Sequence, residues 1–483
     1  MYKVSGEPVS RRGKVRSAAI VRPFAPSLVA IALATVALAG CSTVSMPALD
    51  MDAPPDWGAT ATGEWPGEEW WDAFGSGELR GLMQQVQQRN LSLENAERNL
   101  RQAQLALIDA GFDLYPTPVV NFNASGNYSG AAPPGGAFED SASDAGSLAL
   151  SLSYADILSK PYRFEAAEAA YQSAAAQLAA TRLNLLGTAA STYFRILYAR
   201  DQIEAAKLNL QNAEAIERIT RARVDAGVLT PIDALQQQIA VQRQRNALAQ
   251  LRQEEFAARA ALALLLAEPV RHFDVQATTL DGLLTPLVAP GLPSELLVRR
   301  PDIVQAEMSL RQARANVTIA RNALLPGISL TASANTASSD LRRLTSDNSV
   351  AASLSASLVQ NVFDFGRRGR ARESARLAMD SSLASYREIV IRAFNDIEIA
   401  LGNIELLGSL SRIALEDLKR AEESLRIAEV RYREGVIDYQ RVLTAQDFLY
   451  SARNNVLSNK RAHLNAIVSL YQALGGGWSS QRE

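Results

Sequence analysis

The turn that decides the fold occurs twice, first as Arg223-Val224-Asp225-Ala226-Gly227-Val228-Leu229-Thr230-Pro231 and again as Arg431-Tyr432-Arg433-Glu434-Gly435-Val436-Ile437-Asp438-Tyr439. Each copy lies between two runs of helical periodicity. A glycine just past a helix end supplies the left-handed residue that terminates the helix. Thr230 and Asp438 are then placed to cap the next helix, and Pro231 suits its first position. Both stretches predict a sharp helix–turn–helix tip.

The similarity between the two tips extends along most of the chain. At an offset of 208 residues, Leu235 matches Leu443 and Arg245 matches Arg453. Upstream of the tips, residues 96–103 recur as residues 306–313 at an offset of 210. Because the match holds at both ends of each half, it indicates the duplication of a unit of about 200 residues, which is much longer than a short recurring motif.

The N-terminus has the features of a secretory signal. Residues 1–22 carry six basic residues against one acidic residue, and an apolar run follows over residues 28–39. The run ends in Leu38-Ala39-Gly40-Cys41, which resembles a bacterial lipobox, so residues 1–40 are predicted to be a lipoprotein signal peptide and Cys41 the site of lipid attachment. Ser42 in place of an aspartate implies sorting to the outer membrane. Two alternatives stay open, an incidental cysteine beside an ordinary cleavage site and a twin-arginine route through Arg11-Arg12.

Composition excludes several kinds of function. Cys41 is the only cysteine, so the chain has no disulfide framework, and its two histidines do not suffice for a histidine-rich metal site. The formal charge is −2 for the whole chain, and removal of the signal makes the mature chain more acidic. A nucleic-acid partner is therefore not expected. The chain shows no nucleophile elbow, phosphate loop or metal-ligand spacing, so we expect no enzyme and no cofactor other than the covalent lipid.

Four segments alternate with a period of two, which predicts β-strands. They are residues 120–128, 148–154, 328–334 and 352–358, two in each half of the chain. One face of each segment is apolar, and the other is rich in Ser, Asn and Thr. Such alternation also fits a half-buried sheet in a soluble protein. In an exported, lipidated chain, segments of this length instead favour membrane strands around a water-filled lumen. Because four strands cannot close a barrel, the chain is expected to oligomerise.

Long helices account for most of the remainder. Residues 77–113 predict one helix, residues 162–226 and 370–434 predict two of about 65 residues each, and residues 232–266 and 440–474 predict the returning helices. At 1.5 Å per residue the longest would reach about 100 Å. Long alanine-rich hairpins are often structural coiled coils, so a coiled-coil lipoprotein spacer of the cell envelope remains the alternative function.

Taken in order, these elements resemble the lipoprotein branch of the TolC-like outer-membrane efflux factors, the OprM/NodT type. The resemblance covers nearly the whole mature chain. The motifs that carry it are Cys41, Trp70-Trp71, Arg299-Arg300-Pro301-Asp302-Ile303, Asp364-Phe365-Gly366-Arg367 and Tyr471-Gln472-Ala473-Leu474-Gly475-Gly476-Gly477-Trp478.

The resemblance implies both a fold and a function. The fold is an internally duplicated α+β membrane protein, in which a homotrimer forms a twelve-stranded barrel in outer-membrane lipid that continues into a periplasmic α-helical tunnel. The function is a passive exit duct of a tripartite efflux system. Its partners would be a periplasmic adaptor, also called a membrane-fusion protein, and an inner-membrane transporter of the RND or ABC type.

The resemblance also assigns residues. Adaptor contacts would fall at the two tips, on Arg223, Gly227, Val228, Arg431, Gly435 and Val436. The tunnel constriction would fall close by, on Asp438, Gln440, Arg441 and Thr444. Family members often carry an aspartate where this chain reads Leu443-Thr444-Ala445-Gln446, which puts an acidic, cation-attracting ring in doubt.

The expected organisation follows from these assignments. It consists of a signal peptide (1–40), an extended N-terminal segment (41–76), a first repeat (77–285), a linker (286–298), a second repeat (299–474) and a C-terminal tail (475–483).

Overall fold

The computed structural model describes residues 67–131, 139–288, 296–338 and 350–478. The predicted signal peptide, Cys41 and most of the segment predicted as extended (41–76) lie outside these ranges. No helix in the described part of the chain is both long and apolar enough to cross a membrane.

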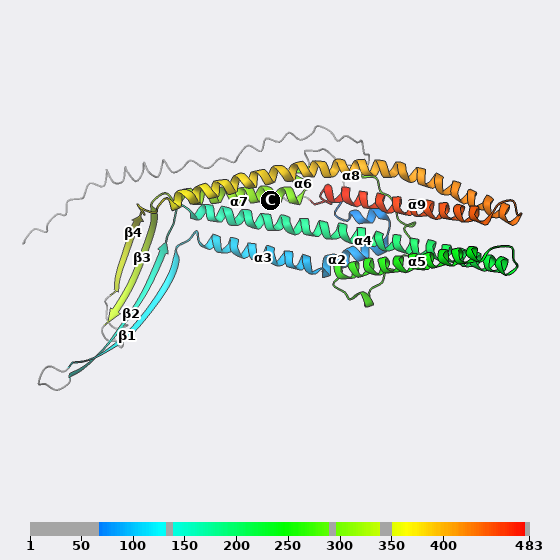
Figure 1. The fold of residues 1–483 in the computed structure, drawn as a ribbon. Helices are drawn as coiled ribbons and strands as arrows, with labels where there is room; N and C mark the ends of the chain where they lie inside the picture. The colour runs from blue at the N-terminus through cyan, green and yellow to red at the C-terminus, as the bar shows by residue number, and fades with distance from the viewer. Residues whose placement is uncertain (1–66, 132–138, 289–295, 339–349, 479–483) are drawn as a thin grey trace, which may run out of the picture. The chain divides into compact units, whose positions relative to one another are not determined.

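Four helices form two long hairpins, as predicted (Figure 1). In the first hairpin α4 (Lys160–Asp225) is followed by α5 (Pro231–Leu265), and in the second α8 (Arg367–Arg433) is followed by α9 (Tyr439–Ala473). The longer helices contain 66 and 67 residues, which corresponds to about 100 Å each. Each begins where a strand ends, so strands and hairpin turns lie at opposite ends of the same helices.

The prediction of one continuous helix over residues 77–113 is wrong. The structure has α2 (Gly77–Arg89) and α3 (Leu91–Phe112), separated at Asn90. The side-chain Oδ1 of Asn90 accepts hydrogen bonds from Ser92 N (2.9 Å) and Leu93 N (3.1 Å), and its Nδ2 donates to Leu265 O (2.9 Å). Asn90 therefore starts a new helix and ties it to the end of α5, a use of asparagine that helical periodicity does not reveal.

Two other predicted boundaries also need correction. The segment predicted as extended, residues 41–76, contains a 3₁₀-helix, η1 (Trp70–Phe74). The predicted linker, residues 286–298, overlaps the short helix α6 (Leu296–Arg299), which leads directly into α7 (Pro301–Asn322). A second 3₁₀-turn, η2 (Val270–His272), follows α5. In each case tertiary packing orders residues whose local pattern is irregular.

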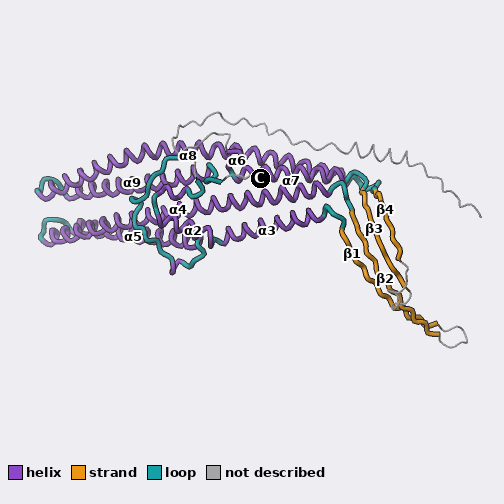
Figure 2. The backbone as a smooth tube through the Cα atoms, turned by 180° about the vertical axis from the view of Figure 1, so that it is seen from behind, coloured by secondary structure: helices purple, strands orange, loops and turns teal. Residues whose placement is uncertain are grey.

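The four predicted strands form one antiparallel sheet in chain order (Figure 2). They are β1 (Thr117–Ala131), β2 (Glu139–Tyr154), β3 (Gly327–Ser338) and β4 (Val350–Val359). The register places Val120 opposite Leu150, Leu150 opposite Ala334, and Ala334 opposite Ala352. The apolar positions of all four strands therefore share one face, as the alternation predicted.

The two faces of the sheet differ sharply in chemistry. The apolar face exposes its large side chains, with Phe122 at 60%, Leu150 at 48% and Leu354 at 82%. The opposite face carries small uncharged groups at its centre, where the hydroxyls of Ser333 and Ser353 lie 2.8 Å apart. The outer edges of β1 and β4 pair with no strand among the described residues.

An aromatic core holds η1 against the middle of α4 and the end of α9. Trp70 stacks on Tyr471 of α9 with ring centroids 5.0 Å apart, and Phe74 lies 5.1 Å from Phe194 of α4. Trp71 is 1% exposed. Trp70 and Phe74 therefore fix the end of the N-terminal segment against α9 and α4.

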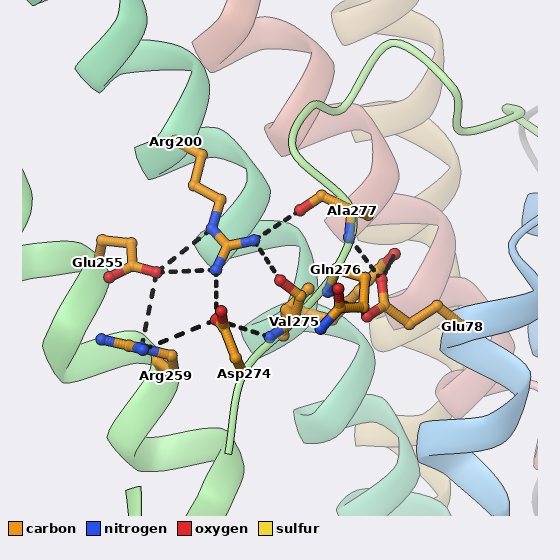
Figure 3. Close-up of polar contacts among 9 residues, drawn as sticks. Glu78, Arg200, Glu255, Arg259, Asp274, Val275, Gln276 and Ala277 are labelled. Carbon is orange, nitrogen blue, oxygen red and sulfur yellow. Dashed lines mark hydrogen bonds and ion pairs between the residues drawn. The ribbon is translucent and has the colours of Figure 1, made fainter. Parts of the chain in front are cut away.

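Residues 267–288, here called the strap, cross the first hairpin and are held there by hydrogen bonds and ion pairs of charged side chains (Figure 3). Arg200 of α4 donates to Asp274 Oδ1 (2.7 Å), to Glu255 Oε1 of α5 (3.2 Å) and to the carbonyl oxygens of Val275 and Ala277. Glu78 of α2 accepts hydrogen bonds from the backbone nitrogens of Gln276 and Ala277. One arginine and one glutamate therefore join α2, α4, α5 and the strap.

The start of the predicted tail, residues 475–483, is packed against the rest of the chain. Gly475, Gly476 and Gly477 all have positive φ. A Cβ added at Gly475 would overlap the carbonyl group of Arg299, and one at Gly477 would overlap the backbone of Gly67 and Glu68. Glycine is required here both for backbone conformation and for space.

We predict that Gly475→Ala lowers the apparent thermal midpoint of the purified protein, because an overlap with backbone cannot be relieved by a rotamer change. The expected cost is about 2 kcal/mol or more, from strain and overpacking together. Gly81→Ala on α2 is the matched control, since nothing lies within 4 Å of its added Cβ and alanine is favoured in a helix interior. Equal midpoints for the two variants would contradict the packing described for Gly475.

Candidate functional site

The two predicted tips are built by the same hydrogen bonds. Gly227 and Gly435 have φ values of 74° and 73°. Val228 N donates to Arg223 O (2.8 Å), and Val436 N donates to Arg431 O (2.9 Å). Gly227 N donates to Val224 O (2.9 Å), and Gly435 N to Tyr432 O (3.1 Å). These pairs make a Schellman motif at each helix end, so the prediction of glycine-terminated helices is confirmed.

Side chains cap the helices that follow the tips. Asp438 Oδ1 accepts a hydrogen bond from Arg441 N (3.1 Å) at the start of α9. At the start of α5, Asp233 Oδ2 accepts from Thr230 N (2.8 Å) and Thr230 Oγ1 (2.6 Å). These bonds from Thr230 hold the pKa of Asp233 below its ordinary value, because they favour the carboxylate. Both turns are therefore fixed on both sides.

The two tips also contact each other. The guanidinium carbon of Arg223, at the end of α4, lies 4.8 Å from the centroid of the Tyr432 ring at the end of α8. Our sequence reasoning did not select Tyr432. The available signal was that an aromatic ring stands where the first half has Val224. A cation–π contact of this kind contributes about 0.5–1 kcal/mol at an exposed site.

A groove beside the second tip brings together most of the predicted constriction and contact residues. Its volume is about 890 Å³, and it runs between the end of α8 and the start of α9. The predicted residues that line it are Arg431, Val436, Asp438, Gln440, Arg441 and Thr444. Ile427 and Phe448, which sequence reasoning did not select, add an apolar wall to the groove, and Phe448 is 63% exposed.

The side chains that line this groove do not make it acidic. Arg431 and Arg441 contribute two positive charges, whereas Asp438 contributes one negative charge and uses a carboxylate oxygen as a helix cap. The hydroxyl of Thr444 donates to Gln440 O (2.9 Å), so it is also engaged within α9.

The remaining predicted site residues lie elsewhere. Gly227 and Val228 belong to the first turn, where Val228 is 71% exposed, and Gly435 forms the second turn. Cys41 is outside the described residues. Within the described ranges, no three His, Cys, Asp or Glu side chains gather in a way that could hold a metal ion.

Comparison with known proteins gives matches over both halves of the chain. Residues 82–268 and 292–476 match the family model described as outer membrane efflux protein. The pyoverdine export outer membrane protein OpmQ of Pseudomonas aeruginosa is 34% identical over 466 residues, covering 93% of this chain and 97% of OpmQ. The cation efflux system protein CusC of Escherichia coli is 28% identical over 411 residues, covering 85% of this chain and 88% of CusC.

Solved structures agree with these matches. The structure of the Neisseria gonorrhoeae MtrE outer membrane channel in its open state is 26% identical in sequence and matches with a TM-score of 0.79. It covers 92% of this chain and 99% of the MtrE chain.

We predict that Tyr432→Leu loosens the contact between the tips, because it removes the ring that faces Arg223. Spin labels attached at positions 228 and 436, in a Cys41→Ser background, would report the loss as a broader distance distribution in pulsed electron resonance. Tyr432→Phe keeps the ring and should keep the narrow distribution. A Leu variant as narrow as the Phe variant would show that the ring does not hold the tips together.

Proposed function

The chain belongs to the outer membrane efflux protein family, and from this membership we propose that it acts as the outer-membrane exit duct of a tripartite efflux system. The observation that carries the proposal is the match of the family model to both halves, joined to a sheet that is apolar on one face and polar on the other. An apolar outer face suits lipid, and a small, uncharged, hydroxyl-rich inner face suits a water-filled lumen.

We propose that three copies form one barrel of twelve strands. The open edges of β1 and β4 support this assembly, since edge strands in hydrocarbon would leave backbone groups unpaired. Joining β4 of one copy to β1 of the next removes every edge.

The helices support the same assembly. Near the sheet α4 and α7 have helical neighbours on both sides, whereas α3 and α8 stand at the two margins. Near the tips the order is α5, α4, α9 and α8, so α5 and α8 are marginal.

Exposed large apolar side chains gather on these marginal helices, and in the described chain α7 exposes none. They include Ile108 and Phe112 on α3, Ile232, Leu235 and Ile239 on α5, and Ile399, Leu406 and Ile413 on α8. Contact between neighbouring copies would cover them.

The tips are the proposed docking site for a periplasmic adaptor. They lie about 100 Å along α4 and α8 from the strands, far into the periplasm if the strands span the outer membrane. Val228 and Val436 are 71% and 67% exposed, and each follows a rigid glycine turn. Arg223, Gly227, Arg431 and Gly435 would complete this surface. The adaptor would connect the duct to an inner-membrane transporter of the RND or ABC type.

The constriction is proposed at Asp438, Gln440, Arg441 and Thr444. Their place in one groove at the second tip supports this assignment. We further propose a lipid on Cys41 as a second attachment to the outer membrane. The duct would be a passive conduit, with no catalytic residue and no cofactor.

We predict that Leu150→Arg and Leu354→Arg impair insertion into the outer membrane, because each places a charge in hydrocarbon at a cost of about 2–4 kcal/mol at mid-depth. Ser151→Arg is the matched control, because residue 151 lies on the polar face beside Leu150. The measurement is the fraction of heat-resistant trimer in outer-membrane preparations. Full assembly of the two leucine variants would favour the alternative, a coiled-coil spacer.

We predict that Gly435→Pro, or a bulky residue at Gly227, abolishes export while the trimer remains intact. Each change disturbs a turn with positive φ, and no atom lies within 4 Å of the Cβ position at either glycine, so packing elsewhere is spared. Susceptibility to exported compounds would be measured in a strain that lacks its own duct. Wild-type resistance in these variants, at normal expression, would argue against docking at the tips.

A further inference from the structure

A hollow of about 690 Å³ lies over the polar face of α4, between α5 and α9. The residues that carry the argument are Thr188, Thr192 and Arg195 from α4, Glu254 from α5, and Arg461 and Asn465 from α9. Eight of the nine lining residues come from α4 and α9, the inner helices of the wall near the tips, and only Glu254 comes from the marginal helix α5, so most of the hollow lies away from the margins where neighbouring copies would meet.

The position of α4 in the core shows which way the hollow faces. Tyr193, Phe194 and Leu197 are buried in the aromatic core with η1 and the strap. Thr188, Thr192 and Arg195 lie on the opposite side of the helix, as their spacing of four and three residues requires. The layer formed by η1, α2 and the strap would block a tunnel if it lay inside, so in the proposed duct it lies outside and the hollow faces the lumen.

Polar atoms without partners line the α9 side of the hollow. Arg461 Nε and Asn465 Oδ1 are buried and make no hydrogen bond within the described structure. Asn454 Oδ1 is also buried without a hydrogen bond among the described residues, and Asn454 lies on the same helix face, seven residues before Arg461. Buried polar atoms nearly always have partners, so the hydrogen bonds within the chain are incomplete along this face of α9.

The two arginines of the hollow are not neutralised by ion pairs among the described residues, and a cation–π contact positions Arg461. The guanidinium carbon of Arg461 lies 4.1 Å from the centroid of the Tyr198 ring. Within the described residues neither Arg195 nor Arg461 forms an ion pair, whereas Arg200 and Arg259 nearby pair with Glu255 and Asp274. Glu254 is the one acidic side chain that lines the hollow.

We propose that this hollow is a lumenal subsite for anionic solutes, such as those bearing carboxylate or sulfonate groups. Two guanidinium groups would bind the anion, and the hydroxyls of Thr188 and Thr192 and the amide of Asn465 would complete the contacts. Three copies would stand around the tunnel. The inference rests on the proposed function, since only a duct gives this face a lumen.

The test is direct binding of the trisulfonate dye pyranine to the purified protein, followed by fluorescence anisotropy at low salt. Arg195→Gln with Arg461→Gln should weaken binding at least tenfold. Arg243→Gln with Arg252→Gln is the charge-matched control, because both arginines are exposed residues of α5 outside the hollow. Equal weakening by the control, or no weakening by the double variant, would overturn the subsite.

Bilayer recordings separate this inference from the proposed function. A conducting wild-type protein that pyranine blocks, with block lost in the double variant, supports both. Conductance without block rejects the subsite and keeps the duct. Absence of conductance argues against the duct, and the binding experiment then still decides whether the hollow takes anions.

Discussion

A sheet of four strands has two open edges, and here it also has an exposed apolar face. In water the apolar face is unfavourable, and in hydrocarbon the unpaired edges are unfavourable. Neither solvent suits one isolated copy. Closure of several copies into a barrel within a membrane satisfies both requirements together. The apolar margins on α3, α5 and α8 present the same problem along the helices, and the same closure would cover them.

The duplication reproduces the turns but not their surroundings. Both tips carry the Schellman hydrogen bonds, yet the strap is bound to the first hairpin by several bonds to Arg200 and to the second by the ion pair of Asp281 with Lys460 of α9 (3.1 Å). The second half is tied by Arg300, which is 7% exposed and pairs with Asp302 (2.7 Å) and Asp396 (3.2 Å). Arg300 also donates to Ala473 O (3.1 Å) at the end of α9. Because different residues hold the two hairpins, equal turn geometry does not make them mechanically equivalent.

The sequence predicted correctly those features that depend on interactions between neighbouring residues. Glycine at Gly227 and Gly435, caps at Thr230 and Asp438, and a period of two in the strands are all properties of neighbouring residues. The break between α2 and α3 at Asn90 was not predicted, because one of the interactions that stabilise it is the hydrogen bond to Leu265 O, 175 residues away in the sequence. The contact between Arg223 and Tyr432 and the hollow beside Arg461 were missed for the same reason. Of the candidate site, the turns and most of the groove were predictable, whereas the pairing of the tips was not.

The local charge along the proposed path is positive, whereas the net charge of the whole chain is negative. The whole sequence carries −2, yet the groove at the second tip has two arginines and one aspartate, and the hollow has two arginines and one glutamate. Arg195 lies about 45 Å along α4 from the first tip, at 1.5 Å per residue. Asp438 cannot be exchanged freely for another charge, because its carboxylate starts α9. The electrostatic potential along the proposed path therefore depends on which charged side chains face the path and which act as helix caps. In both the groove at the second tip and the hollow beside Arg461, the side chains that face the path favour anions.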